Sequence, residues 1–328
     1  MAFVQPRKAT GEPWVGKQRY LQAWGSFIHA LVDRYKGTVK HWEIENEPNA
    51  DYTPEEYAEL LQIACDHARR ADPQAKIIAF SGGGFQPDFY ERVLKRIDPT
   101  QIDACSVHLY VGNSAPEFAA FAQLPKRLGK PAWNTETGTT CPTFFTTLPE
   151  YEELRRADHW QKLQSKIRIQ TIGTAHNYLL SLSVGGMEKY FHYFGRFVNS
   201  GPSQPTSRFG SGKEITEFDG GLRANGVALC IASHVLDGAA YHGPLALDER
   251  LQVHLFRKDG GTVGFLWGRS EQPLLLGQAG SVSFRDIMGN PIAGASLKVT
   301  DSPIYLRSDD PPDLCAATLA LSTLAPAR

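Results

Sequence analysis

Short apolar runs alternate along the chain with longer segments in which apolar residues recur every three or four positions. The short runs predict strands and the longer segments predict helices. Their alternation is typical of parallel strands joined by crossover helices. The predicted strands span 39–47, 76–80, 102–110, 131–136 and 187–194, and the predicted helices span about 17–35, 53–71, 88–97, 116–128, 151–182 and 221–236.

The pattern changes after residue 238. A polar loop rich in Gly, Ser and Pro at 199–212 precedes the last predicted helix, and short alternating runs separated by turn signals follow it. Such runs predict an antiparallel sheet of the sandwich type. We therefore expect an α/β domain over 1–238, a β-sandwich domain over 239–308 and a loosely attached tail over 309–328.

Composition narrows the class of protein. The chain has 328 residues, 42% of them apolar, and a formal net charge of −1. A near-neutral charge argues against a nucleic-acid binder. The sequence has no stretch of 18 or more apolar residues, so we expect no membrane span. The first residues lack the apolar core of a secretory signal. The cysteines never form a CxxC pair, so the sequence predicts no metal site.

The segment 41–49, HWEIENEPN, contains the strongest chemical signal. Glu47 follows an amide, Asn46, and precedes a proline at the point where a strand runs into a loop, and active sites of parallel barrels are built at such strand ends. Strand alternation predicts Glu43, Glu45 and Glu47 on one face. Three carboxylates together would repel one another, so at least one should be protonated or paired. For Glu43 and Glu45 we favour structural ion pairs.

A second carboxylate, Glu136, ends a later predicted strand in WNTETG, at 133–138. It lies 136 − 47 = 89 residues after Glu47, which fits three βα units of about thirty residues each. The two carboxylates should therefore face one another on the same rim of a barrel. Carboxyl groups about 5 Å apart indicate a retaining mechanism, and a gap of about 6.5–9.5 Å indicates inversion.

These residues resemble clan A of the glycoside hydrolases. The stretch from His41 to Ile78 is most similar to family 39 and its relatives, "IDACSVHLY" resembles their sixth strand, and "KPAWNTETG" their seventh. The resemblance implies a (β/α)8 TIM barrel and a retaining glycosidase that cleaves an O-glycosidic bond in an oligo- or polysaccharide. It implies Glu47 as acid/base, Glu136 as nucleophile and Asn46 as a ligand of the sugar 2-hydroxyl. It also implies no cofactor, no metal, and a chain that is exported.

Other site residues are less sharply indicated. His108 and Tyr110 match positions that in this clan orient the nucleophile and line the site, although His108 is also compatible with an ordinary core histidine. His192 and Tyr193 on the last strand are candidates for binding a sugar, but aromatics there are as often part of a core. The sequence departs from the relatives at Glu45, where they usually carry an aromatic residue.

The clan places the acid/base on the fourth strand of the barrel, so the five predicted strands correspond to strands four to eight. The sequence therefore predicts a barrel that lacks its first three strands, either as a fragment or completed by another chain or an oligomer. An open parallel sheet of this kind would expose two edges.

Two alternatives to an active glycosidase stay open. The chain could be a catalytically impaired carbohydrate-binding fragment with the same fold. A barrel lyase or aldolase would need a lysine or a cluster of metal ligands at a strand end, and Lys189 is the only strand lysine near the last rim.

Overall fold

The computed structural model describes residues 16–110, 114–139, 160–193, 213–216, 221–269, 274–275, 282–293 and 296–323. The chain divides into two compact units. The first contains residues up to Tyr110, Ser114–Thr137 and Met187–Phe191, and the second contains Gly138–Gly186 and the chain from His192 onward.

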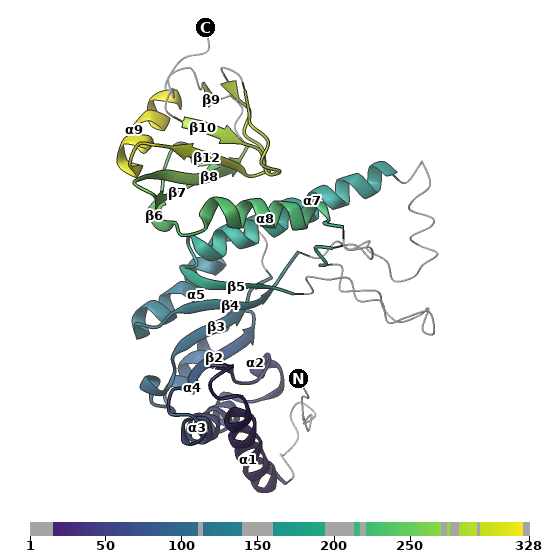
Figure 1. Ribbon diagram of the computed structural model, residues 1–328, viewed down its shortest axis with the longest axis vertical. Coiled ribbons are helices and arrows are strands. Elements are labelled where there is room, and N and C mark those ends of the chain that lie inside the picture. Colours follow the sequence, from purple (N-terminus) through teal and green to yellow (C-terminus); the bar gives the residue numbers. More distant parts are fainter. Residues whose placement is uncertain are drawn as a thin grey trace. The chain divides into compact units, whose positions relative to one another are not determined.

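The first unit is built on a curled parallel sheet. Its five strands lie side by side in chain order (Figure 1): β1 (His41–Glu43), β2 (Lys76–Gly83), β3 (Ala104–His108), β4 (Ala132–Thr137) and β5 (Met187–His192). Strands β1 to β4 pair in parallel, each with the next. The predicted order of parallel strands is therefore confirmed, as part of a barrel-like α/β fold.

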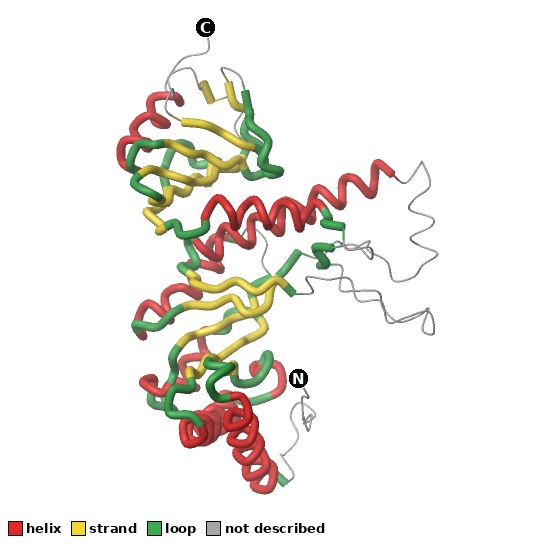
Figure 2. Tube along the Cα trace, viewed as in Figure 1, coloured by secondary structure: helices red, strands yellow, loops and turns green. Residues whose placement is uncertain are grey.

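Helices and one short 3-10 turn connect these strands, and Figure 2 shows α3, α4 and α5 along the same side of the sheet. Helix α1 (Lys17–Tyr35) precedes β1, and the connections contain α2 (Pro48–Asp51), α3 (Pro54–Ala71), α4 (Pro87–Leu94), η1 (Pro99–Gln101) and α5 (Ala115–Leu128). Helix α3 begins with a complete capping box between Thr53 and Glu56, which satisfies two free N–H groups at the helix start. Its Tyr57 is fully buried, donates to the carbonyl of Ile44 and accepts from the N–H of Phe80, so the helix is tied to the ends of β1 and β2.

The first strand is much shorter than predicted. β1 ends at Glu43, because Glu45 and Glu47 have left-handed backbone conformations with φ of 69° and 49°. A left-handed residue cannot continue a strand. The expected alternation of Glu43, Glu45 and Glu47 on one face is therefore wrong.

The second unit contains helices α7 (Trp160–Leu182) and α8 (Ala224–Leu236) and an antiparallel sheet. The sheet order is β10-β12-β8-β7-β6, with β6 (Ala240–Pro244), β7 (Leu251–Lys258), β8 (Gly261–Gly268), β10 (Val282–Arg285) and β12 (Ile304–Ser308). A two-stranded pair is formed by β9 (Leu274–Leu275) and β11 (Ser296–Leu297). The predicted change to antiparallel strands is confirmed.

The expectation of a loose tail over 309–328 is wrong for most of that segment. Residues Pro312–Thr323 form helix α9, and its Cys315 and Leu319 are buried in the aliphatic core on one face of the sheet. Burial of two apolar side chains against Leu251, Val253 and Leu255 holds the helix in place. The opposite sheet face is aromatic, with Phe265, Trp267 and His254 in ring contact.

Some expectations fall outside the described residues, namely the loop at 199–212 and the start of the helix predicted over 151–182. Within the described ranges, no helix is both long and apolar enough to cross a membrane.

Candidate active site

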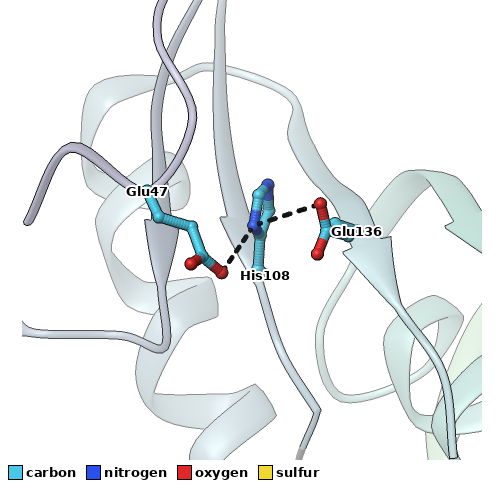
Figure 3. A group of neighbouring side chains, drawn as sticks. All are labelled: Glu47, His108 and Glu136. Carbon is cyan, nitrogen blue, oxygen red and sulfur yellow. Dashed lines mark hydrogen bonds and ion pairs between the residues drawn. The ribbon is translucent and has the colours of Figure 1, made fainter. Parts of the chain in front are cut away.

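Three titratable side chains meet at the carboxyl ends of strands β1, β3 and β4 of the parallel sheet (Figure 3). Glu47 follows β1, His108 ends β3 and Glu136 lies near the end of β4. Nδ1 of His108 is 3.1 Å from Oε1 of Glu47 and 3.9 Å from Oε2 of Glu136. One ligand atom from each residue can be chosen so that all three lie within 4.8 Å of one another. The structure thus brings together the two carboxylates that the strand order placed on one rim and His108, which the family resemblance indicated.

Tyr110 adds a hydroxyl to this cluster. Its OH donates a hydrogen bond of 2.7 Å to Oε1 of Glu136. His108 is only 2% exposed, whereas Tyr110 is at 36% and both glutamates are partly exposed. The cluster therefore has a buried imidazole between two carboxylates that solvent, or a ligand, can reach.

Backbone contacts with β2 determine where Glu47 lies. Its N–H donates to the carbonyl of Ser81, and Glu47 occupies the N-cap position of the short helix α2. Asn49 in that helix brackets Gly83, because its Oδ1 accepts from the N–H of Gly83 and its Nδ2 donates to the carbonyl of Gly83. The loop bearing Glu47 is thus held to the neighbouring strand at both ends. Sequence reasoning missed Ser81, Asn49 and Gly83, although an Asn two residues after the glutamate was a visible signal.

Backbone strain concentrates at these strand ends. Besides Glu45 and Glu47, the non-glycine residues Phe80 and Ser81 have positive φ, of 89° and 36°, and the register of β2 on β3 shifts between Ala79 and Gly82. Each such residue costs about 1–3 kcal/mol and persists only where the surroundings enforce it. Bulges and strained residues of this kind cluster at functional sites, where they aim side chains.

The other two glutamates occupy separate buried environments. Burial raises the pKa of Glu43, which lies beside Ser106 and Thr135 and near Glu136 and His108. Burial, with the charge of Asp51, raises the pKa of Glu45 to about 7. Neither carboxylate has a Lys or Arg partner in the described part of the chain, so the ion pairs expected for them are wrong. The expectation that a carboxyl group here is held protonated agrees with both shifts.

Glu45 gives a testable dependence of stability on pH. Its carboxyl has an ordinary pKa near 4.5, and in the folded protein the pKa is about 7. Between these values the unfolded chain ionises and the folded chain does not, so the free energy of unfolding falls as the pH rises from about 4.5 to 7 and stays lower above. The shift corresponds to about 3 kcal/mol.

We therefore expect the free energy of unfolding of Glu45→Gln not to show this fall. Relative to that of the wild type, it should increase by up to about 3 kcal/mol between pH 4 and pH 8. Urea unfolding at several pH values measures it. Glu117→Gln, at an exposed position of α5, is the matched control and should follow the wild type. Parallel curves for Glu45→Gln and wild type would contradict the prediction.

The remaining predicted site residues have mixed outcomes. Asn46 is exposed and lies directly before Glu47. His192 and Tyr193 belong to the second unit, where Nε2 of His192 is 2.6 Å from the carbonyl oxygen of Lys213 and the ammonium of Lys213 lies 5.0 Å from the ring centre of Tyr193. A role of these three residues in ligand binding stays a prediction.

Glu47, His108 and Glu136 are close enough together to offer three ligands to a metal ion. The hydrogen-bond distance between His108 and Glu47, and the donation from Tyr110 to Glu136, already give each carboxylate a partner. Each carboxylate thus has a side-chain partner within the protein, and the two carboxylates have different environments, as acid/base chemistry requires.

Comparison with known proteins finds likeness in structure only. No protein-family model matches the sequence, and no curated protein matches it. A family 39 glycoside hydrolase from the gut symbiont Bacteroides cellulosilyticus WH2 superposes with a TM-score of 0.64 at 18% identity, covering 90% of this chain and 63% of that one.

Two further solved structures are similar. A family 30 endoxylanase from Clostridium papyrosolvens C71 has a TM-score of 0.55 at 13% identity, covering 90% of this chain and 72% of that one. A family 39 β-xylosidase from Caulobacter crescentus has a TM-score of 0.50 at 14% identity, with the same coverage of 90% and 72%. The resemblance of the sequence to clan A glycoside hydrolases of the family 39 kind is thus confirmed, at the level of the fold.

Proposed function

We propose that this protein is a retaining glycoside hydrolase that cleaves an O-glycosidic bond in an oligo- or polysaccharide. One observation carries the proposal: carboxylate oxygens of Glu47 and Glu136 lie within 4.8 Å of each other at the strand ends. Retaining enzymes hold their two carboxyl groups about 5–5.5 Å apart, and inverting enzymes need about 6.5–9.5 Å to admit a water. The spacing supports double displacement.

In the first step, a carboxylate oxygen of Glu136 bonds to the anomeric carbon while the bond from that carbon to the leaving oxygen breaks. Glu47 gives its proton to that oxygen. In the second step, Glu47 takes a proton from water, the water oxygen bonds to the anomeric carbon, and the bond to Glu136 breaks. The Tyr110 hydroxyl keeps Glu136 oriented, and His108 holds Glu47 beside the reacting bond.

The proposal also assigns the five strands to positions in a barrel and Asn46 to the sugar. The five strands of the first unit would be strands four to eight of a (β/α)8 barrel, in line with the 63% of the Bacteroides family 39 structure that this chain spans. Asn46, exposed beside Glu47, would bond the 2-hydroxyl of the sugar, a contact that strengthens in the transition state.

A turnover assay tests the proposal. Purified protein is incubated with a panel of aryl glycosides that differ in sugar and anomeric configuration, and NMR follows the configuration of the first product. We expect hydrolysis with retention of configuration. Inversion would overturn the double displacement. If sugars bound but no glycoside of the panel were hydrolysed, the assignment as an enzyme would be wrong and a carbohydrate-binding protein would be supported.

Gly83 provides a structural test of how Glu47 is positioned. A Cβ at Gly83 would lie 3.0 Å from Cδ and 3.1 Å from Oε1 of Glu47, and Gly83 does not have a left-handed φ. Alanine therefore fits the backbone but displaces the carboxyl group. We expect Gly83→Ala to lower kcat by about 10²-fold, the effect of misplacing a catalytic group by about 1 Å, at a nearly unchanged melting temperature.

Gly84 is the matched control for Gly83. Its φ is +77° and a Cβ there meets nothing within 4 Å. Gly84→Ala should lower stability, because alanine is strained in the left-handed region, with kcat close to that of the wild type. Equal loss of kcat in both variants would show that Gly83 acts through general destabilisation.

A further inference from the structure

A cavity of about 330 Å³ lies within the second unit, between α8 and the sheet. Ile231, His234 and Val235 of α8 form one wall, and residues of β7, β8, β10 and β12 form the other. Its volume is at the lower end of the range of about 300–1,000 Å³ that is typical of small-molecule sites. This cavity is separate from the cluster of Glu47, His108 and Glu136, which lies in the first unit.

Among the described residues, three cationic side chains and no acidic residue line the cavity. They are Lys258 at the end of β7, Arg285 at the end of β10 and Arg307 on β12. Within the described part of the chain, none of the three forms an ion pair with a carboxylate. The nearby carboxylate of Asp286 is engaged in its own turn, where it accepts from the backbone N–H groups of Met288 and Asn290. Neither Asp286 nor another described carboxylate comes within ion-pair distance of Lys258, Arg285 or Arg307.

Two of the cations are held in place by main-chain carbonyls. The ammonium of Lys258 donates to the carbonyls of His234 and Val235, at 3.2 Å each. Nη1 of Arg285 donates to the carbonyl of Gly289 at 2.8 Å, which leaves its other N–H groups available. Anchoring reduces the conformational entropy that a ligand must remove on binding. Arg307 has no hydrogen-bond or ion-pair partner for its guanidinium among the described residues.

The rest of the wall combines apolar and polar side chains. Val263 and Leu306 contribute apolar surface, Ser283 carries a hydroxyl and His234 an imidazole. Tyr305 is 2% exposed, and its hydroxyl has no hydrogen-bond partner among the described residues. An apolar wall with few polar groups and a concentration of positive charge fits a small ligand with one anionic group.

We propose that this cavity binds an acidic sugar residue through its carboxylate or sulfate group, with the Arg285 and Arg307 guanidinium groups as the main donors. Planar guanidinium groups bind carboxylate and sulfate oxygens in pairs of parallel hydrogen bonds. That the anion is carried by a carbohydrate rests on the proposed function, whereas the binding of an anion does not. The second unit would then hold an acidic polysaccharide independently of the bond that is cleaved.

The test uses the full chain with Glu136→Gln, so that no ligand is consumed. Calorimetric titrations compare an oligogalacturonate, a sulfated oligosaccharide, a neutral xylo-oligosaccharide and inorganic sulfate. Arg307→Gln is compared with Arg257→Gln, which removes the same charge from an exposed position of β7 outside the cavity. We expect an acidic oligosaccharide to bind Arg307→Gln at least about tenfold more weakly than it binds the Glu136→Gln chain without a further substitution. Its affinity for Arg257→Gln should equal that for the Glu136→Gln chain.

Three results would overturn the proposal. Equal weakening by both arginine variants would reduce the effect to overall charge. Equal binding of neutral and acidic oligosaccharides at the Arg307-dependent site would show that the site does not recognise an anionic group. If inorganic sulfate bound as tightly as the sulfated oligosaccharide, the site would recognise the anion alone and not a carbohydrate. The aryl glycoside assay on the wild-type chain is separate, so failure of the proposed hydrolase is distinguished from failure of this site.

Discussion

Glu136→Gln is expected to abolish hydrolysis, with a fall in kcat of about 10⁴-fold or more, as for the loss of other nucleophiles. Glutamine has the size of glutamate, and its amide oxygen can still accept the hydrogen bond from Tyr110, 2.7 Å long in the native site. The geometry is therefore kept and only the attacking oxygen anion is lost. Steady-state turnover of the best aryl glycoside of the panel measures the effect.

Two variants sharpen the interpretation of Glu136. Tyr110→Phe keeps the nucleophile but removes its hydrogen bond, so a smaller loss of about 10-fold to 100-fold is expected, in line with the worth of a hydrogen bond to a charged group. Glu117→Gln removes an exposed carboxylate of α5 and should leave kcat unchanged. If Glu136→Gln retained more than a tenth of the wild-type kcat, the assignment of the nucleophile would be wrong.

Glu47→Gln is expected to lower kcat by about 10²-fold to 10⁴-fold, the usual contribution of a general acid/base. The amide can still face Nδ1 of His108, which lies 3.1 Å from Oε1 of Glu47, so the loss reflects proton transfer.

The dependence of the rate on the leaving group distinguishes loss of proton donation by Glu47 from displacement of its carboxyl group. Dinitrophenol leaves without a proton, whereas phenol needs one, so bond cleavage in Glu47→Gln should be far more impaired for phenyl glycosides than for dinitrophenyl glycosides. Gly83→Ala, in which the carboxyl is present but displaced, should impair the two substrates more evenly. The same dependence on leaving group in Glu47→Gln and in the wild type would refute Glu47 as the acid.

Much of the site could be predicted because it depends on local pattern. A glutamate followed by proline, a few residues after the apolar residues of a strand, indicates the loop at the carboxyl end of that strand. The order of strands and helices then places Glu47 and Glu136 on one rim, the family resemblance adds His108 and Tyr110, and the distances agree with this prediction. The alternating runs after residue 238 predicted the antiparallel strands for the same reason, since a period of two needs only one buried face.

The details around Glu47 could not be predicted from pattern. Strand alternation extended the first strand to residue 47, but the chain leaves the sheet after Glu43 and adopts left-handed conformations at Glu45 and Glu47. Contacts from other segments enforce them: Ser81 donates to the carbonyl of Glu45 and accepts from the N–H of Glu47. No local propensity favours such conformations in a non-glycine residue.

The tail shows the same limit for packing. Residues 312–323 have almost no separation of apolar and polar faces, and the sequence therefore gave no sign of a docked helix. Cys315 and Leu319 are nevertheless buried in the aliphatic core. Whether a short helix docks depends on the surface that it meets, which a local pattern does not contain.

By itself, the sequence determined the order of strands and helices, the change to antiparallel strands and the two carboxylates at strand ends, because each follows from periodicity and from residues close along the chain. Only the tertiary structure decided that Glu43, Glu45 and Glu47 point into three different environments, that Gly83 and Asn49 hold the loop, and that three cations surround one cavity. These features arise between segments far apart in the sequence, where strain in one segment is offset by hydrogen bonds and burial supplied by another.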